Sequence, residues 1–245
     1  MRQLTPDDIL RVWEFGQGKS LVEQAVILLA PAFPELSRDQ LYQLPIGNRD
    51  LRLLHLRRAL AGERLAGKSI CPECDAELQF SLNVSQLTMG DYRQARPASY
   101  TESFDAFRVT FRPLNSLDQL HVAGVYDVEE AAERMRRAGI LRAESAGAAV
   151  AFEALPDAVV DAVGERVIEV DPQVEVRFSL NCAVCETRFS AVFEAVEFVW
   201  CEVVALAGNT LEEVVLLARA FGWSERDILG MTPRRRQRYL DMVPT

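Results

Sequence analysis

The chain has few of the side chains on which most enzymes depend. Its 245 residues include only two histidines, His55 and His121, and neither has a catalytic partner at a recognisable spacing. There is no glycine-rich phosphate loop and no nucleophile motif, so no pattern indicates a hydrolase, a transferase or an oxidoreductase. His55 lies within a leucine-rich stretch, where packing is the ordinary role of a histidine. We therefore predict a protein that is not an enzyme and has no small-molecule substrate.

A long apolar run and an excess of positive charge are also missing. The best apolar candidate, residues 25–33, is interrupted by Pro31 and is shorter than the roughly 18–20 residues of a membrane span. The first residues are acidic, whereas a secretory signal is basic and then apolar. The formal charge of −9 argues against general nucleic-acid binding, which requires a basic surface. We expect a cytoplasmic protein with no membrane span and no nucleic-acid partner.

Four of the five cysteines form two Cys-x-x-Cys pairs, Cys71 with Cys74 and Cys182 with Cys185. A two-residue gap lets both thiolates of a pair bind one ion, and two pairs complete the tetrahedral sulfur shell that zinc prefers. Reduced thiols in the cytosol favour a metal over disulfides. We predict one structural zinc per chain, held by these four residues. Two alternatives are four unrelated thiols and a redox pair, which needs a βαβ context that the sequence lacks.

The separation of the two pairs is unusually large. Between Cys74 and Cys182 lie 107 residues, against roughly 12–20 in a compact zinc ribbon. A shared metal would therefore join two distant parts of the chain, which is an architectural role rather than a catalytic one. The fifth cysteine, Cys201, stands among apolar residues and is predicted to be an inert buried thiol.

Hydrophobic periodicity predicts an α+β fold that is mainly helical. Alternating apolar and polar residues predict strands beside the cysteine pairs, at residues 78–84 and 174–180, and a further strand at 107–111. Residues 187–193 are expected to form a partner strand after the second cysteine pair. The strands beside the cysteines would form a small antiparallel, zinc-ribbon-like sheet that joins helical N- and C-terminal halves. Helix starts are predicted at the capping residues Thr5, Ser20, Ser37, Asn48, Ser116, Thr210, Ser224 and Thr232.

These patterns divide the chain into four parts. We expect an N-terminal helical region at residues 1–70 and a C-terminal helical region at residues 195–245. The zinc-ribbon-like unit would combine residues 71–85 with residues 173–194, and residues 86–172 would form an α/β insertion between the two cysteine turns. Helices are expected in the insertion at residues 128–137 and 156–163.

Three arginines near the C-terminus, Arg234, Arg235 and Arg238, form a local basic cluster. The apolar residues around them are too many for a free tail, so we expect one side of this segment to pack on the protein. The arginine side would then face a partner, because guanidinium groups form paired hydrogen bonds with carboxylates. A solvated helix face is the alternative interpretation.

Several stretches also share their order and spacing with one known family. They are residues 44–50, 53–57, 71–74, 171–176, 182–185, 217–229 and 235–240. Together they resemble baseplate proteins of contractile phage tails and related contractile injection systems. The second cysteine turn of that family usually reads Cys-Pro-x-Cys-Gly, whereas here Ala183 and Glu186 replace the proline and the glycine. The resemblance implies a structural component or assembly factor of a baseplate, in contact with hub, wedge or other baseplate subunits.

A cytosolic zinc-ribbon adaptor or regulator, acting with nucleic acid or transcription machinery, is the alternative function. It would need a basic face on the zinc-ribbon-like unit. The residues around the cysteine turns include the acids Glu73, Asp75, Glu77 and Glu186. These acids favour the interpretation as a baseplate protein.

Overall fold

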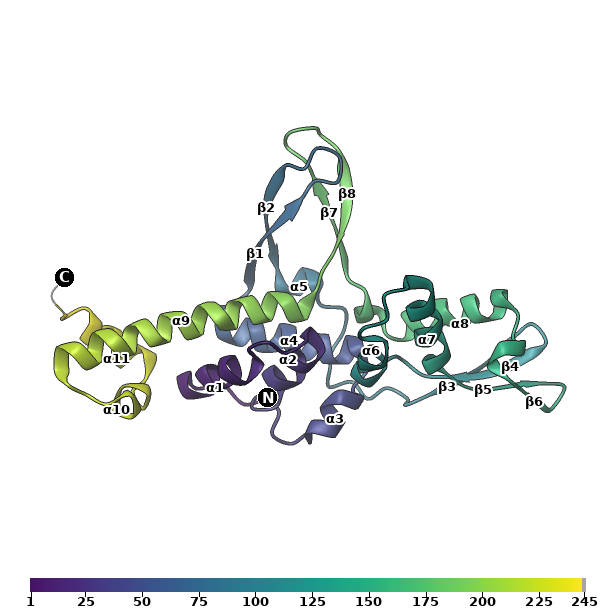
Figure 1. Ribbon diagram of the computed structural model, residues 1–245, viewed down its shortest axis with the longest axis horizontal. Coiled ribbons are helices and arrows are strands. Elements are labelled where there is room, and N and C mark those ends of the chain that lie inside the picture. The colour runs from purple at the N-terminus through teal and green to yellow at the C-terminus, as the bar shows by residue number, and fades with distance from the viewer. Residues whose placement is uncertain (244–245) are drawn as a thin grey trace. The chain divides into compact units, whose positions relative to one another are not determined.

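The computed structural model describes residues 1–243, which fall into two structural units. The first unit combines residues 1–35 with the chain from Val196 onward, and the second unit is residues 36–195. Over residues 1–243 the chain is mainly helical and has three small antiparallel sheets (Figure 1). The predicted fold class is therefore confirmed.

Within the described residues of the first unit, all regular secondary structure is helical. Hydroxyl groups of Thr5, Ser20, Ser224 and Thr232 accept hydrogen bonds from amides in the first turns of its helices, as predicted. The prediction for Thr210 is wrong, because its Oγ1 donates to the Leu206 carbonyl inside one continuous helix, at 2.7 Å. The helices are α1 (Pro6–Gly16), α2 (Leu21–Leu29), α9 (Ala195–Phe221, from Val196 onward), α10 (Glu225–Leu229) and α11 (Pro233–Leu240).

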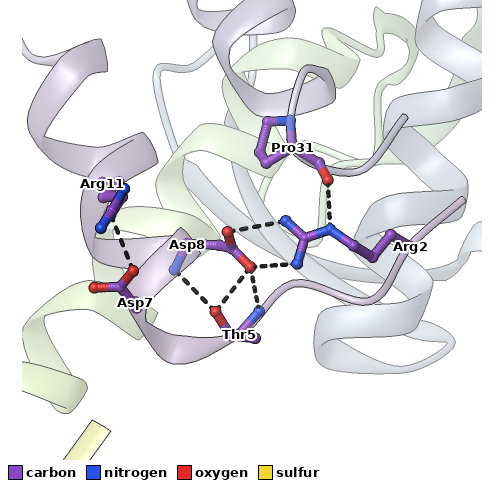
Figure 2. A network of polar contacts seen from close by, with 6 residues as sticks. All are labelled: Arg2, Thr5, Asp7, Asp8, Arg11 and Pro31. Carbon is purple, nitrogen blue, oxygen red and sulfur yellow. Dashed lines mark hydrogen bonds and ion pairs between the residues drawn. The ribbon is translucent and has the colours of Figure 1, made fainter. Parts of the chain in front are cut away.

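A polar network at the start of α1 ties the N-terminal segment to the end of α2 (Figure 2). The Arg2 guanidinium donates to both oxygens of Asp8, at 2.8 and 2.9 Å, and its Nε donates to the Pro31 carbonyl at 3.0 Å. Asp8 also accepts from the backbone amide of Thr5, which completes the cap of α1. The Arg2 contact, followed by the Thr5 contacts, lowers the pKa of Asp8 to about 2 although partial burial opposes the shift.

We expect Asp8→Asn to lower the free energy of unfolding of the first unit by about 1 kcal/mol at pH 7. The Asp8 pKa is lower in the folded chain than in the unfolded chain. The contribution is therefore complete above about pH 4 and is lost as the pH falls toward about 2. Tryptophan fluorescence measures this selectively, because Trp13, Trp200 and Trp223 all belong to the first unit.

Urea unfolding at pH 7, 4 and 2.5 is the appropriate measurement. Asp7→Asn is a matched control, because Asp7 forms an exposed pair with Arg11 that contributes little. A difference between Asp8→Asn and the wild type that stays constant from pH 7 to pH 2.5 would contradict the linkage.

The second unit contains a four-stranded antiparallel sheet in the order β3-β4-β5-β6. Helix α8 (Asp157–Val170) packs on one face of this sheet, where Val109 and Phe111 of β4 join Val159 and Val163 in a buried core. The strands are β3 (Tyr100–Phe104), β4 (Phe107–Phe111), β5 (Ile140–Ser145) and β6 (Ala148–Val150). The predicted strand at 107–111 is confirmed as β4. The other three strands were missed because none of them alternates clearly over its short length.

The other helical segments of the second unit are α3 (Arg38–Gln43), α4 (Ile46–Ala61), α5 (Val84–Leu87), α6 (Ser116–Val122), α7 (Val128–Gly139), η1 (Phe152–Ala154) and η2 (Pro172–Val174). Ser37 caps α3 as predicted. Asn48 does not cap α4, since that helix begins at Ile46 and the Asn48 side chain donates to the Tyr92 carbonyl. Asn115, the residue before Ser116, caps α6.

Two β-hairpins complete the second unit, and their turns lie at the same end (Figure 1). The first hairpin is β1 (Arg64–Ile70) with β2 (Glu77–Asn83), and the second is β7 (Arg177–Asn181) with β8 (Arg188–Val192). Three of these four strands fall where the sequence predicts strands. The fourth, β1, was missed because the small and polar residues at 66–69 interrupt its apolar alternation.

Candidate metal centre

The two cysteine turns have the same backbone conformation. In the first turn, the Cys71 amide donates to the Ala76 carbonyl and the Asp75 amide donates to the Cys71 carbonyl, both at 3.0 Å. In the second turn, the equivalent bonds join Cys182 with Thr187 at 2.9 Å and Glu186 with Cys182 at 3.0 Å. Each hairpin therefore presents its two thiols from one tight turn.

The residue after the second cysteine of each turn has a left-handed backbone conformation. The φ angle is 56° at Asp75 and 59° at Glu186, in the region that favours glycine. Glu186 stands where the family that this sequence resembles usually has a glycine, but it adopts the conformation that this turn requires. The replacement should cost about 1 kcal/mol relative to glycine and leaves the path of the turn unchanged.

The structure brings all four paired cysteines to one point. Their Sγ atoms lie within 4.8 Å of one another, and the distances from Cys71 to Cys185 and from Cys74 to Cys182 are both 3.6 Å. These distances far exceed the roughly 2.0 Å of a disulfide. They are close to the roughly 3.8 Å between ligands that bind zinc tetrahedrally at about 2.3 Å. Four thiols at this spacing fit a tetrahedral, sulfur-bound metal.

The two exposed thiols of the cluster, Cys74 and Cys185, have pKa shifts in opposite directions. Hydrogen bonds from the hydroxyl and amide of Thr187 lower the pKa of Cys185 to about 6. The Ala76 amide acts in the same direction on Cys74, but contacts with the neighbouring thiols and burial outweigh it and raise that pKa to about 12. Four thiolates this close repel one another unless a cation lies among them, and a metal would therefore bind with release of protons.

Aromatic packing supports the cluster below the turns. Phe80 on β2 and Phe178 on β7 contact each other, with 4.9 Å between their ring centroids. Cys71 and Cys182, the first cysteine of each turn, are buried, whereas Cys74 and Cys185 are exposed. The two hairpins thus face each other through apolar side chains and through sulfur.

A second long-range contact lies at the N-terminus of α4, where no local sequence pattern predicts it. Pro45 offers no side-chain cap to this helix, and the buried Asp171 accepts the Gly47 amide hydrogen at 2.8 Å instead. Arg96 donates to the other oxygen of Asp171 at 3.3 Å. Burial raises the pKa of Asp171, although the Gly47 and Arg96 contacts oppose that effect. Two of the family-like stretches, residues 44–50 and 171–176, therefore meet here.

The predicted arginine cluster lies on α11 and is not part of the cysteine site. Arg234, Arg235 and Arg238 are exposed, whereas Arg236 is buried and donates to Glu213 of α9 at 2.8 Å. The helix therefore has an inner side anchored by Arg236 and an outer side that carries the three predicted residues.

Two other residues discussed from the sequence lie outside the four-cysteine cluster. Cys201 was expected to be buried but is exposed, because Val199 and Val203 take the inward positions on this part of α9. His55 contacts the ring of Tyr92, and burial lowers its pKa, as expected for a packed histidine.

The fold and the site together define a mainly helical protein in which distant segments of the chain meet at a four-cysteine cluster. The chain belongs to the family described as T4 bacteriophage base plate protein, which matches residues 18–199 and so includes the whole second unit. The resemblance to phage baseplate proteins is thus confirmed. Searches of curated proteins and of solved structures find no match. Across residues 1–243, no helix has the length and apolar character of a membrane span.

Proposed function

We propose that this protein is a structural component or assembly factor of a contractile-tail baseplate, with its second unit held together by one zinc ion. The observation that carries the proposal is the convergence of four Sγ atoms within 4.8 Å in a member of a baseplate family. Membership of the family supports a structural role in the virion and assembly with other baseplate proteins.

Cys71, Cys74, Cys182 and Cys185 would hold the zinc. The ion would supply a fixed cross-link between the turns of the two hairpins, and a shell of four sulfurs would leave no open position for substrate. The contact between Phe80 and Phe178 already positions the hairpins for this arrangement. A structural, non-enzymatic role is consistent with these features.

A zinc-ribbon adaptor for nucleic acid is the weaker alternative. The surface around the two turns carries the exposed acids Glu73, Asp75 and Glu186. Such a surface repels phosphate and is suited to a protein partner.

We further propose that the outer side of α11 binds an acidic surface of another baseplate subunit. Arg234, Arg235 and Arg238 are exposed there, while the buried Arg236 fixes the helix through Glu213. An arginine–carboxylate pair contributes about 0–1 kcal/mol when exposed, and several kcal/mol in some desolvated interfaces. A cluster of three is therefore well suited to docking.

Reversing the three charges, with Arg234→Glu, Arg235→Glu and Arg238→Glu combined, tests this interface. We expect a folded variant that keeps its metal but enters particles at least tenfold less, measured as copies of the chain in purified particles. Lysine at the same three positions is the matched control, because it keeps the charge but loses the paired hydrogen bonds, and it should have an intermediate effect. Normal incorporation of the glutamate variant would leave these arginines as a solvated face.

A further inference from the structure

The outward face of α9 carries a row of residues that the described chain leaves mostly exposed. We define the α9 seam as Glu197, Cys201, Val204, Gly208, Leu211, Val215 and Arg219. These residues follow one another at intervals of three or four, the spacing that places side chains on one helix face. Cys201 is exposed, and Val204 and Val215 keep 38% and 46% of their surface accessible. Val203, Ala207, Thr210 and Leu217 instead form the inward, buried face.

Gly208 lies near the middle of the seam and of the 27-residue helix. Glycine is the least favourable residue in a helix interior after proline, so its presence here needs a packing reason. A Cβ built on Gly208 meets no atom of the chain within 4 Å. The chain's own packing therefore does not require glycine. A second helix that approaches closely at this position would require it.

The charges at the two ends of the seam are arranged symmetrically about Gly208. Glu197 precedes Gly208 by eleven residues and Arg219 follows it by eleven. Eleven residues are about three helical turns, so both charges return to the face on which Gly208 lies. Both side chains are exposed, and neither has an ion-pair partner within residues 1–243.

We propose that α9 pairs in an antiparallel manner with α9 of a second copy of this chain, with the two-fold axis at Gly208. Glu197 then faces Arg219 of the partner subunit, and the symmetric pair forms at the other end. Cys201 faces Val215 of the partner subunit, and the apolar middle of each seam covers the other. A parallel pair would place Glu197 against the same residue of the partner, so the charges select the antiparallel arrangement.

Charge exchange tests the pairing in the metal-loaded, full-length protein by sedimentation velocity over a range of concentrations. We expect a monomer–dimer equilibrium for the wild type. Glu197→Arg and Arg219→Glu should each raise the dimer Kd at least tenfold, because each places like charges opposite one another. The combined variant restores both pairs and should return to within about threefold of the wild type. Asn209→Arg, which is exposed on the same helix but outside the seam, is the control and should change nothing.

Two further variants separate association from folding and fix the orientation. Gly208→Leu should keep or raise the thermal midpoint, followed by tryptophan fluorescence, yet abolish the dimer. Under mild oxidation, Val215→Cys should form a covalent dimer with the native Cys201, whereas the wild type should not. A wild type that is monomeric at 100 µM overturns the proposal. So do unaffected single charge variants, or a combined variant that fails to recover.

Discussion

Removing the metal from the four-cysteine site is expected to lower the free energy of unfolding of the second unit by several kcal/mol. Two-stranded hairpins are marginal on their own, and the contacts that join these two include the Phe80–Phe178 pair and the sulfur cluster. The metal would also close a loop of more than a hundred residues, which restricts the unfolded chain. In small peptides, structural zinc binds with roughly 10–16 kcal/mol at neutral pH, and part of that should appear here as stability.

The measurement combines metal content with local protection. Metal analysis of the purified protein should give about one zinc per chain, and Cys182→Ser should lose it. Amide hydrogen exchange should then rise in both hairpins, while tryptophan fluorescence reports on the first unit alone. Cys201→Ser is the matched control and should retain the zinc. Full zinc retention after combining Cys71→Ser with Cys182→Ser would exclude the site, and unchanged exchange after chelation would exclude its structural role.

Gly47→Ala is expected to destabilise the second unit by about 2–4 kcal/mol. The new Cβ would lie 2.3 Å from Oδ1 of Asp171, a buried carboxylate that is held by the Gly47 amide and by Arg96. The carboxylate must then move, which breaks its hydrogen bonds and leaves a buried charge without partners. Amide exchange in α4, together with denaturant unfolding followed by circular dichroism, would measure the loss.

A double-mutant cycle identifies the cause. Asp171→Ala removes the group with which the new methyl collides, so Gly47→Ala should cost much less in that background than in the wild type. Gly164→Ala in α8 is the matched control, because a Cβ there meets no atom within 4 Å, and it should stabilise the helix slightly. Additive costs for Gly47→Ala and Asp171→Ala would contradict the proposed collision.

The family match divides the chain in a way that bears on these proposals. It ends at residue 199, so the cysteine site and the Gly47–Asp171 contact lie inside the matched region. Most of the α9 seam and the arginines of α11 lie beyond it. Two C-terminal stretches that contributed to the resemblance, residues 217–229 and 235–240, lie outside the match. Their similarity to the family therefore stays a prediction. The matched region therefore contains the two long-range contacts within the chain, and the surfaces proposed to bind partners lie mainly outside it.

Much of the local structure could be predicted from the sequence, because its causes are local. Hydroxyl caps at Thr5, Ser20 and Ser224 bond to amides three residues away, so the sequence signal and the contact coincide. Period-two alternation identified β2, β4 and β7 for the same reason. The spacing within each cysteine pair likewise determines the turn that presents its thiols.

The remaining features depend on contacts between residues that are far apart in the chain. Thr210 has the sequence pattern of a helix cap, yet it lies inside α9, because the packing of that helix keeps it continuous. Helix α4 takes its cap from Asp171, 124 residues away, which no local pattern could indicate. By itself, the sequence determined that two thiol-bearing turns exist. Only the tertiary structure brought them together, because hairpin pairing and the Phe80–Phe178 contact place the two turns at one point.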